Sequence, residues 1–252
     1  MLWLIFVNFK DRFKGESASK IGNMSPSVPS GTLDDFFSLK IFRSFLMVWA
    51  LKLKMLQKSA LVFIDAGYLS KISKYFGSGK HIKLDLILFS KRLAEKQELV
   101  CEHVFYYTAP PFQGVFPTPL EMRLKAGYDS FMNNVKKSSM ITVREGRLQK
   151  IGSSFTQKGV DTLLTMDLCQ EPFDRKINCI ILLAADTDFV PVLNQLRFKN
   201  KVKVFLYYFT DRIRGSLFSM SNHLLTACNK SILLTKEDFI SNTLDNKNEK
   251  KG

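Results

Sequence analysis

The sequence predicts an α/β protein in which helices flank a mainly parallel central sheet. From residue 60 onward, short apolar runs with strand character alternate with segments of helical periodicity. This alternation predicts right-handed strand–helix–strand units, which build a parallel sheet covered by helices. Two of the apolar runs also stop directly at an aspartate, at Asp65 and at Asp186. Open α/β sheets bind their ligands beyond the carboxyl ends of their strands, so these two positions direct attention to that edge.

The first elements follow from simple patterns. Residues 60–65 (ALVFID) are apolar up to the last position, which is typical of a strand buried on both faces, and Ala66-Gly67 supplies a turn after it. Residues 84–99 place apolar side chains at helical spacing. Residues 100–109 (VCEHVFYYTA) have strand composition, and two prolines close them.

The middle of the chain is expected to hold a helix and a hairpin. Residues 119–137 predict a helix that is interrupted or bent near Gly127. Residues 140–143 and 147–151 are short strand-like pieces on either side of Glu145-Gly146, which predicts a hairpin.

The remaining elements repeat the alternation. We expect helices at 159–169, 189–198 and 215–227, and strands at 177–184, 202–207 and 231–234. The chain therefore divides into an N-terminal extension at 1–57, one domain at 58–235 and a polar C-terminal tail at 236–252.

The composition favours a polyanionic partner. The 252 residues carry a formal net charge of +14, with 46% hydrophobic and 24% charged residues. A basic excess of this size suits nucleic acid or an anionic membrane surface, although a solvated lysine-rich surface is the plain alternative. The four cysteines and three histidines are scattered, so they predict neither a zinc site nor a disulfide framework. Free thiols favour a reducing compartment, and we expect a cytoplasmic protein.

The N-terminal extension has two interpretations. Its apolar runs at 1–8 and 41–53 are shorter than the roughly 18–20 residues that span a bilayer, so no stable membrane span is expected. Residues 15–32 are rich in Ser, Gly and Pro, which indicates loop or disorder. Residues 38–54 are either part of an upstream extension, which we favour, or an amphipathic helix on a membrane surface.

Four aspartates are candidates for one acidic site. Asp65, Asp186 and Asp188 follow apolar strands, and Asp161 lies in the first turn of a predicted helix. Carboxylates that converge need a cation or a proton between them, and a Mg²⁺ or Mn²⁺ pair suits phosphodiester hydrolysis. Purely structural roles compete with this interpretation: Asp188 as a helix cap, Asp186 as a solvated strand end, and Asp161 as a partner of the helix dipole. Asp167 lies roughly 240° around the helix from Asp161 and cannot share its face.

Three motifs occur in order along the chain: F-I-D-A-G-Y-L at 63–69, K-G-V-D at 158–161 and A-A-D-T-D-F-V-P at 184–191. Together they resemble the NYN domain in its LabA-like branch. The resemblance covers about residues 58–235 and leaves the N-terminal segment unexplained. It has departures: Tyr68 stands where many members carry Asn, Ala185 replaces Gly, and Asn222 replaces a frequent Asp.

The resemblance implies a PIN-like, Rossmann-like three-layer fold and a metal-dependent endoribonuclease that hydrolyses RNA. By resemblance, Asp65, Asp161, Asp186 and Asp188 would be both the catalytic and the metal-binding carboxylates for Mg²⁺ or Mn²⁺. A non-catalytic NYN-like module that binds RNA or regulates is the alternative. PIN-like folds often form homodimers, but the sequence names no interface.

Three basic residues are candidates for RNA binding. Lys158 lies beside Asp161, and Arg212 and Arg214 follow the strand predicted at 202–207. Such residues would neutralise phosphates without reading sequence, which makes binding sensitive to salt. The alternative is ordinary solvated surface charge.

Overall fold

The computed structural model describes residues 58–152, 154–213 and 215–243. The chain divides into one unit at 1–51 and another at 52–252, and every described residue belongs to the second unit. The expected N-terminal extension at 1–57, with the possible membrane-surface helix at 38–54, therefore lies outside the described residues. No helix within the described ranges is long and apolar enough to cross a membrane.

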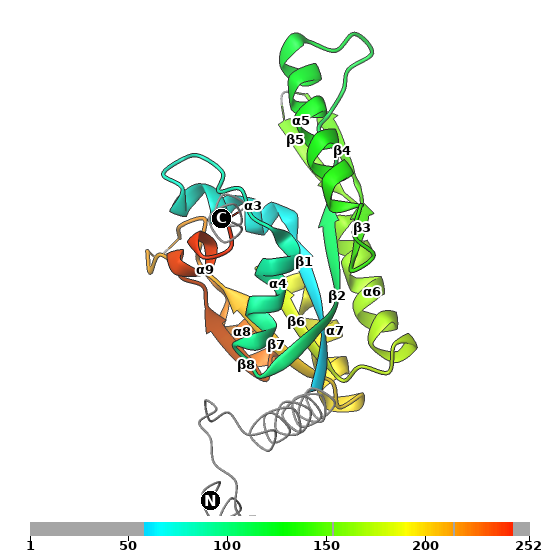
Figure 1. Cartoon of the computed structure of the whole chain (residues 1–252), viewed down its shortest axis with the longest axis vertical. Helices are drawn as coiled ribbons and strands as arrows, with labels where there is room; N and C mark the ends of the chain where they lie inside the picture. The colour runs from blue at the N-terminus through cyan, green and yellow to red at the C-terminus, as the bar shows by residue number, and fades with distance from the viewer. Residues whose placement is uncertain (1–57, 153, 214, 244–252) are drawn as a thin grey trace, which may run out of the picture. The chain divides into compact units, whose positions relative to one another are not determined.

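The core of the second unit is a six-stranded parallel sheet (Figure 1). The strand order is β3-β2-β1-β6-β7-β8, and each neighbouring pair is parallel. The strands are β1 (Lys58–Asp65), β2 (Leu99–Thr108), β3 (Ile141–Glu145), β6 (Cys179–Leu183), β7 (Lys203–Tyr208) and β8 (Lys230–Leu233). The predicted α/β fold with a mainly parallel sheet is confirmed.

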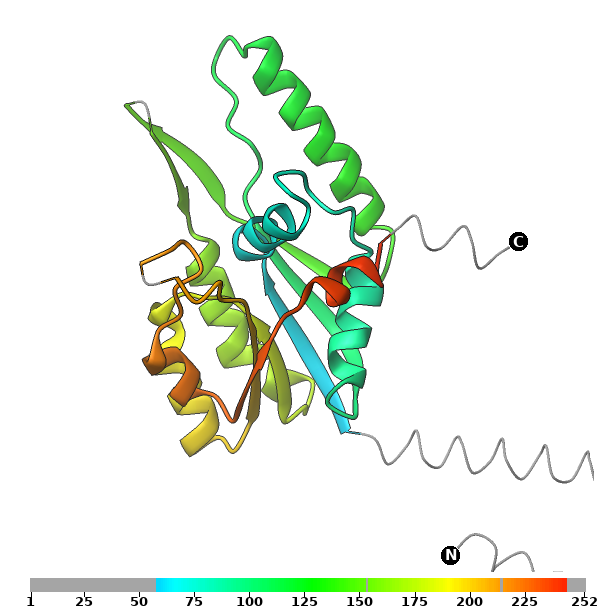
Figure 2. The same cartoon turned by 90° about the vertical axis from the view of Figure 1, so that its left-hand side faces the viewer.

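Helices cover both faces of the sheet, which gives three layers (Figure 2). Alternate residues of β1 enter different cores: Val62 and Ile64 pack on one side, Leu61 and Phe63 on the other. The first core is closed by α3 (Ala66–Phe76), α4 (Leu86–Glu95) and α9 (Lys236–Ile240), and the second by α6 (Val160–Asp174), α7 (Val190–Asn194) and α8 (Asn222–Ala227). A strand buried on both faces needs apolar residues throughout, which explains its unbroken run.

One helix and one hairpin extend beyond the carboxyl edge of the sheet (Figures 1 and 2). They are α5 (Pro119–Val135) and the antiparallel pair β4 (Arg147–Ile151) and β5 (Ser154–Lys158). Thr118 and Glu121 form a capping box at the start of α5, and Met132 is its buried residue. The helix runs through Gly127 without the expected interruption.

The hairpin prediction was wrong in its partners. Residues 141–145 join the main sheet as β3 beside β2, whereas β4 pairs with β5, a strand the sequence did not predict. Gly146 separates the two sheets at a point where another chain segment passes closely. A Cβ at this position would lie 2.5 Å from the carbonyl oxygen of Lys158 and 2.6 Å from Cγ2 of Val160. Glycine is therefore required by close approach rather than by a hairpin turn.

The helix expected at 189–198 is divided into three short pieces. A 3₁₀ turn, η1 (Thr187–Phe189), precedes α7, and a π-helical turn, η2 (Gln195–Lys199), follows it. Pro191 lies in the first turn of α7, where its missing N–H costs no helical hydrogen bond.

The helix expected at 215–227 is present only from Asn222 onward, as α8. The preceding loop has its own hydrogen bonds: Asp211 Oδ1 accepts from Ser216 Oγ at 2.7 Å and from Ile213 N at 3.0 Å. These bonds favour a turn over a helix in this stretch.

The packed domain extends past the expected boundary at residue 235. The segment expected to begin a polar tail forms α9, whose Phe239 is fully buried. Asp238 is buried as well and pairs with Lys96 at the end of α4. Residues 236–243 therefore pack against the domain, while 244–252 lie outside the described residues.

Candidate active site

The four predicted aspartates are carried by adjacent elements. Asp65 is the last residue of β1, and Asp186 and Asp188 follow β6, which pairs with β1. Ile64 is in register with Leu183, so the two strands end side by side. Asp161 occupies the first turn of α6, the helix after β5.

Asp65 caps the helix that follows it. Its Oδ1 accepts a hydrogen bond of 2.8 Å from the backbone N of Gly67. Burial raises the pKa of Asp65, and the negative charge of Asp161 raises this pKa further, while backbone hydrogen bonds from Gly67 and Tyr68 and the charge of Lys71 oppose the shift. The Asp65 carboxylate is thus only partly compensated.

Asp161 connects the other three aspartates electrostatically. Partial desolvation raises the pKa of Asp161, and the charges of Asp186 and Asp188 raise it further. Because Asp65 also feels the charge of Asp161, Asp161 interacts unfavourably with each of the other three carboxylates. A divalent cation bound among them would relieve this repulsion.

The capping roles around η1 differ from the structural alternative suggested by the sequence. Asp186 Oδ1 accepts a hydrogen bond of 2.9 Å from the backbone N of Asp188, so Asp186 is the N-cap and Asp188 supplies the amide. Both side chains are exposed. An ionised carboxylate has about four lone-pair sites, and a single capping bond leaves sites open for a cation.

The donor chemistry suits Mg²⁺ or Mn²⁺, because both ions prefer carboxylate oxygens. The arrangement of these side chains is less favourable for a metal site made by the protein alone. Among the residues that the structure describes, no group of three or more His, Cys, Asp or Glu side chains could hold a metal ion. The protein thus brings the carboxylates into one electrostatic cluster without forming a complete cage.

Gln157 is a neighbour of the cluster that the sequence did not reveal. A Cβ at Gly67 would lie 3.2 Å from Asp65 Oδ1 and 3.7 Å from Gln157 Oε1. The end of the Gln157 side chain, carried by β5, therefore lies close to the end of β1. Gln157 was missed because β5 was not predicted. The glycine directly after Ala66 was the available signal for a close approach.

Tyr68 connects the start of α3 to the end of β7. Its hydroxyl accepts a hydrogen bond of 2.8 Å from the backbone N of Phe209 and donates one of 3.2 Å to the carbonyl oxygen of the same residue. Burial raises the pKa of Tyr68 to about 12, so the hydroxyl keeps its proton at neutral pH. The Tyr that replaces the usual Asn thus ties together two segments at the carboxyl edge.

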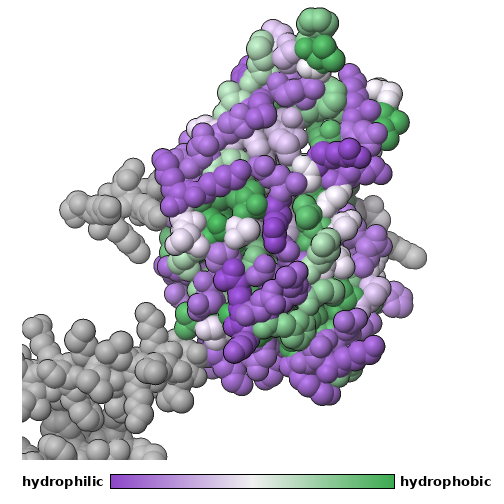
Figure 3. Space-filling view, turned by 90° about the vertical axis from the view of Figure 1, so that its right-hand side faces the viewer, coloured by the Kyte–Doolittle hydropathy of each residue, from purple (hydrophilic) through white to green (hydrophobic). Residues whose placement is uncertain are grey.

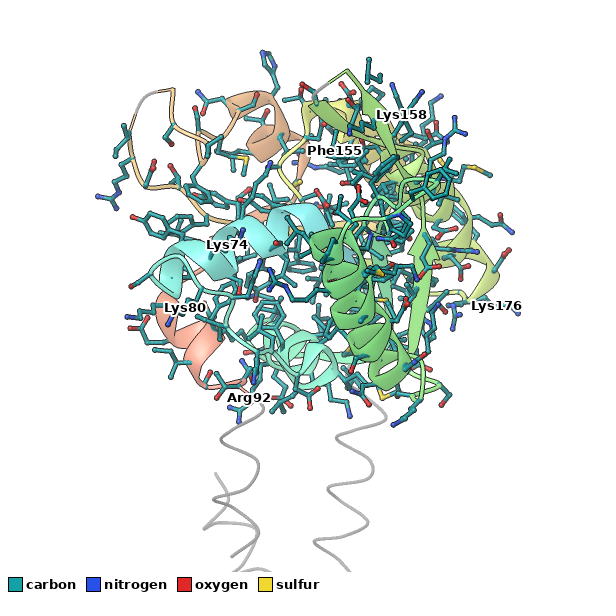
Figure 4. The ribbon with its side chains drawn as sticks, turned by 90° about the horizontal axis from the view of Figure 1, so that it is seen from above. Lys74, Lys80, Arg92, Phe155, Lys158 and Lys176 are labelled. Atoms are coloured by element: carbon teal, nitrogen blue, oxygen red, sulfur yellow. The ribbon has the colours of Figure 1, made fainter. Side chains whose placement is uncertain are left out.

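The candidate RNA-binding residues lie on two different elements. Lys158 is exposed at the end of β5, on the projecting hairpin (Figure 4). Arg212 is exposed in the loop after β7, with a positive φ of 62°. Arg214 lies outside the described residues.

Asp167 belongs to a structural network instead of the acidic cluster. It accepts a hydrogen bond of 2.8 Å from Tyr107 Oη and pairs with both Nε and Nη2 of Arg144, at 2.8 and 2.9 Å. The Arg144 charge compensates the buried carboxylate, and the Asp167 partner raises the pKa of Arg144. Its exclusion from the face of Asp161 is consistent with these contacts.

Comparison with known proteins identifies the family. No curated protein matches the chain significantly. A crystal structure of a protein of unknown function from Vibrio parahaemolyticus is similar, with 13% identity over 73% of this chain and 96% of that chain, and a TM-score of 0.48. The sequence profile of the NYN domain matches residues 59–235, which contain all of the parallel sheet except Lys58, and all four aspartates. This chain belongs to the NYN domain family.

Proposed function

We propose that this NYN domain is a metal-dependent endoribonuclease of the LabA-like branch, which hydrolyses RNA phosphodiester bonds. The observation that carries the proposal is the electrostatic cluster of four aspartates beyond the carboxyl ends of β1 and β6. Asp65, Asp161, Asp186 and Asp188 are the catalytic group. A cytoplasmic location stays a prediction.

The same four aspartates would hold Mg²⁺ or Mn²⁺. Mg²⁺ is often bound by one or two carboxylates, with substrate phosphate oxygens and waters completing its shell. A cluster in which no three described side chains converge fits this mode better than a cage made by protein alone. When bound, the ion supplies a more acidic attacking water and stabilises the leaving oxygen. Metal binding should therefore be weak without RNA and stronger with it.

The basic residues would hold the RNA backbone. Lys158 and Arg212 are exposed, and Arg214 is close to Arg212 in sequence. Each cation that neutralises a phosphate releases counterions, so affinity should fall steeply with salt. The net charge of +14 provides general attraction for the same partner.

A non-catalytic RNA-binding or regulatory module is the second candidate. It is favoured by the fact that Asp65 and Asp186 already serve as caps and by the absence of a three-ligand group among the described residues. In that function the carboxylates would stabilise α3 and η1 without chemistry.

Cleavage of labelled single-stranded RNA by the full chain, with Mn²⁺ or with EDTA, tests the proposal. Asp186→Asn removes a carboxylate while keeping a good N-cap, so the fold should survive. We expect a loss of about 100-fold or more, since a ligand to the metal is worth several kcal/mol. Glu95→Gln makes the same charge change at an exposed position of α4 and should cleave normally.

The two candidates give different results. Metal-dependent cleavage that disappears in Asp186→Asn supports the ribonuclease. RNA binding without cleavage, and without RNA-dependent Mn²⁺ binding in calorimetry, supports the non-catalytic module. Equal cleavage by both variants would reject the assigned site.

A further inference from the structure

One face of the β4–β5 hairpin combines an aromatic ring with a cation. Directly paired residues of antiparallel strands share a face, and residues two apart along a strand do so as well. Lys150 pairs with Phe155, and Leu148 pairs with Gln157. These four residues therefore lie on one face, which we call the hairpin platform.

The platform offers an exposed ring next to a cation. The Phe155 side chain is 52% exposed, and its ring centroid lies 5.5 Å from that of Phe112. Lys150 Nζ lies 5.8 Å from both centroids. Arg147 and Lys158 pair with each other on the opposite face of the hairpin, and neither strand contains Asp or Glu. An exposed aromatic ring beside a cation, on a hairpin that carries only positive charges, suits a flat, anionic ligand.

The platform leads to the acidic cluster. Gln157 follows Phe155 on the same face, roughly 6.6 Å further along the strand. The Oε1 atom of Gln157 is near Gly67, beside Asp65 Oδ1. One residue later, Lys158 ends β5, and α6 begins with Asp161 in its first turn. Figure 4, which looks down on the carboxyl edge, shows Phe155 and Lys158 on this hairpin.

We infer that the hairpin platform binds single-stranded RNA by stacking an unpaired base on Phe155, and that it guides the strand toward the four aspartates. The inference rests on the proposed function and narrows its substrate class. Stacking on an aromatic side chain needs a base whose face is free, which a duplex does not present. Lys150 provides phosphate neutralisation on the platform itself, and Arg147 and Lys158 add positive charge from the opposite face of the hairpin.

Charge favours RNA over a second copy of this chain as the occupant. The projecting part also exposes apolar residues near its free end, where Val115 and Phe116 are each 92% exposed, and Figure 3 shows hydrophobic patches there among hydrophilic residues. Such patches can mark a protein interface. A symmetric dimer contact through the hairpin, however, would bring together two hairpins whose charged residues are all positive, and these would repel each other.

The test measures RNA binding by fluorescence anisotropy in EDTA, where cleavage cannot contribute. The full-length chain and its Phe155→Ala variant are titrated into a labelled single-stranded oligoribonucleotide and its duplex form. We expect Phe155→Ala to bind the single strand about 5- to 100-fold more weakly, with an unchanged salt slope. Phe155→Trp should retain affinity, and both variants should keep the unfolding midpoint of the parent because residue 155 is exposed.

Phe198→Ala is the matched control. Phe198 is 61% exposed and lies 5.0 Å from the Arg197 guanidinium, but it belongs to η2, which precedes β7 at the amino edge of the sheet. The affinity of the Phe198→Ala variant for RNA should differ from that of the parent by less than twofold.

Several results would overturn the inference. Equal affinity of Phe155→Ala and the parent, equal affinity for single strand and duplex, or no RNA binding at all would each do so. A parent dimer in sedimentation that dissociates in Phe155→Ala, with RNA affinity unchanged, would assign the surface to a second copy. Cleavage in Mn²⁺ is measured separately. RNA binding that depends on Phe155 but without cleavage would support RNA binding by the hairpin platform and reject the ribonuclease proposal. Cleavage together with RNA binding that does not depend on Phe155 would reject only the role of the hairpin platform.

Discussion

Removing one oxygen atom from Tyr68 should destabilise the domain measurably. The hydroxyl serves both the N–H and the carbonyl of Phe209, at 2.8 and 3.2 Å, in a buried position. Tyr68→Phe keeps the ring and leaves two backbone groups without this partner. A buried polar group left unsatisfied costs about 1–3 kcal/mol. For a domain of this size, the midpoint should fall by about 2–4 °C per kcal/mol, so a loss of about 2–12 °C is expected.

Thermal and urea unfolding followed by circular dichroism measure this effect. Tyr75→Phe is the control on the same helix, because Tyr75 is exposed and contacts Phe209 and Phe218 through its ring, which phenylalanine retains. Its midpoint should stay within about 1 °C of the parent, in the range of an ordinary surface change. If Tyr68→Phe and Tyr75→Phe unfold together with the parent, the hydroxyl bridge has no net stabilising role and the reasoning is refuted.

Two further predictions concern the acidic cluster and the glycines. In EDTA at pH 7, Asp161→Asn should raise the unfolding midpoint, because it removes a partly desolvated charge and its repulsion from Asp186 and Asp188. The pKa of Asp161 is raised in the folded state, so its titration stabilises the parent below the unfolded value of 3.8, and this stability is lost as the pH rises through the folded pKa. The stability advantage of Asp161→Asn over the parent should therefore shrink on acidification. A gain in the midpoint that is independent of pH would contradict the electrostatic explanation. Gly146→Ala should lower stability by about 1–3 kcal/mol, because its Cβ meets the Lys158 carbonyl oxygen at 2.5 Å. Gly127→Ala, with open space in the middle of α5, should instead raise stability by about 0.5–1 kcal/mol, and equal effects in urea unfolding would exclude the steric explanation.

Apolar periodicity in the sequence predicted the strands and helices that bury apolar residues, but it did not predict elements whose residues are mostly exposed. β1 and β6 are buried on both faces, so their unbroken apolar runs were sufficient. In contrast, every residue of β5 is exposed, and its composition carries no alternation. The pairing of β4 with β5 was therefore invisible to a method based on periodicity.

The helix expected at 215–227 shows the opposite error. Leu217 completed an apolar spacing, but this side chain is largely exposed and contributes little to the core. Local hydrogen bonds to Asp211 decided the conformation of this loop instead.

The acidic site was predictable in position and less so in detail. Strand ends located Asp65 and Asp186, because adjacent parallel strands terminate together. Which aspartate caps η1, and how near Gln157 comes, depend on side-chain contacts between residues far apart in sequence. No spacing rule contains that information.

The position of β1 in the sheet also sets the order of events during synthesis. β1 is the first described strand to leave the ribosome, yet it lies in the interior of the sheet, and Ile64 finds its partner Leu183 only roughly 120 residues later. At about 5–20 residues per second, that delay lasts on the order of 10 s. Throughout it, the edge of β1 that pairs with β6 has no partner strand. An unpaired strand edge favours aggregation, so a pause in translation before residue 183 should increase aggregation of the nascent domain.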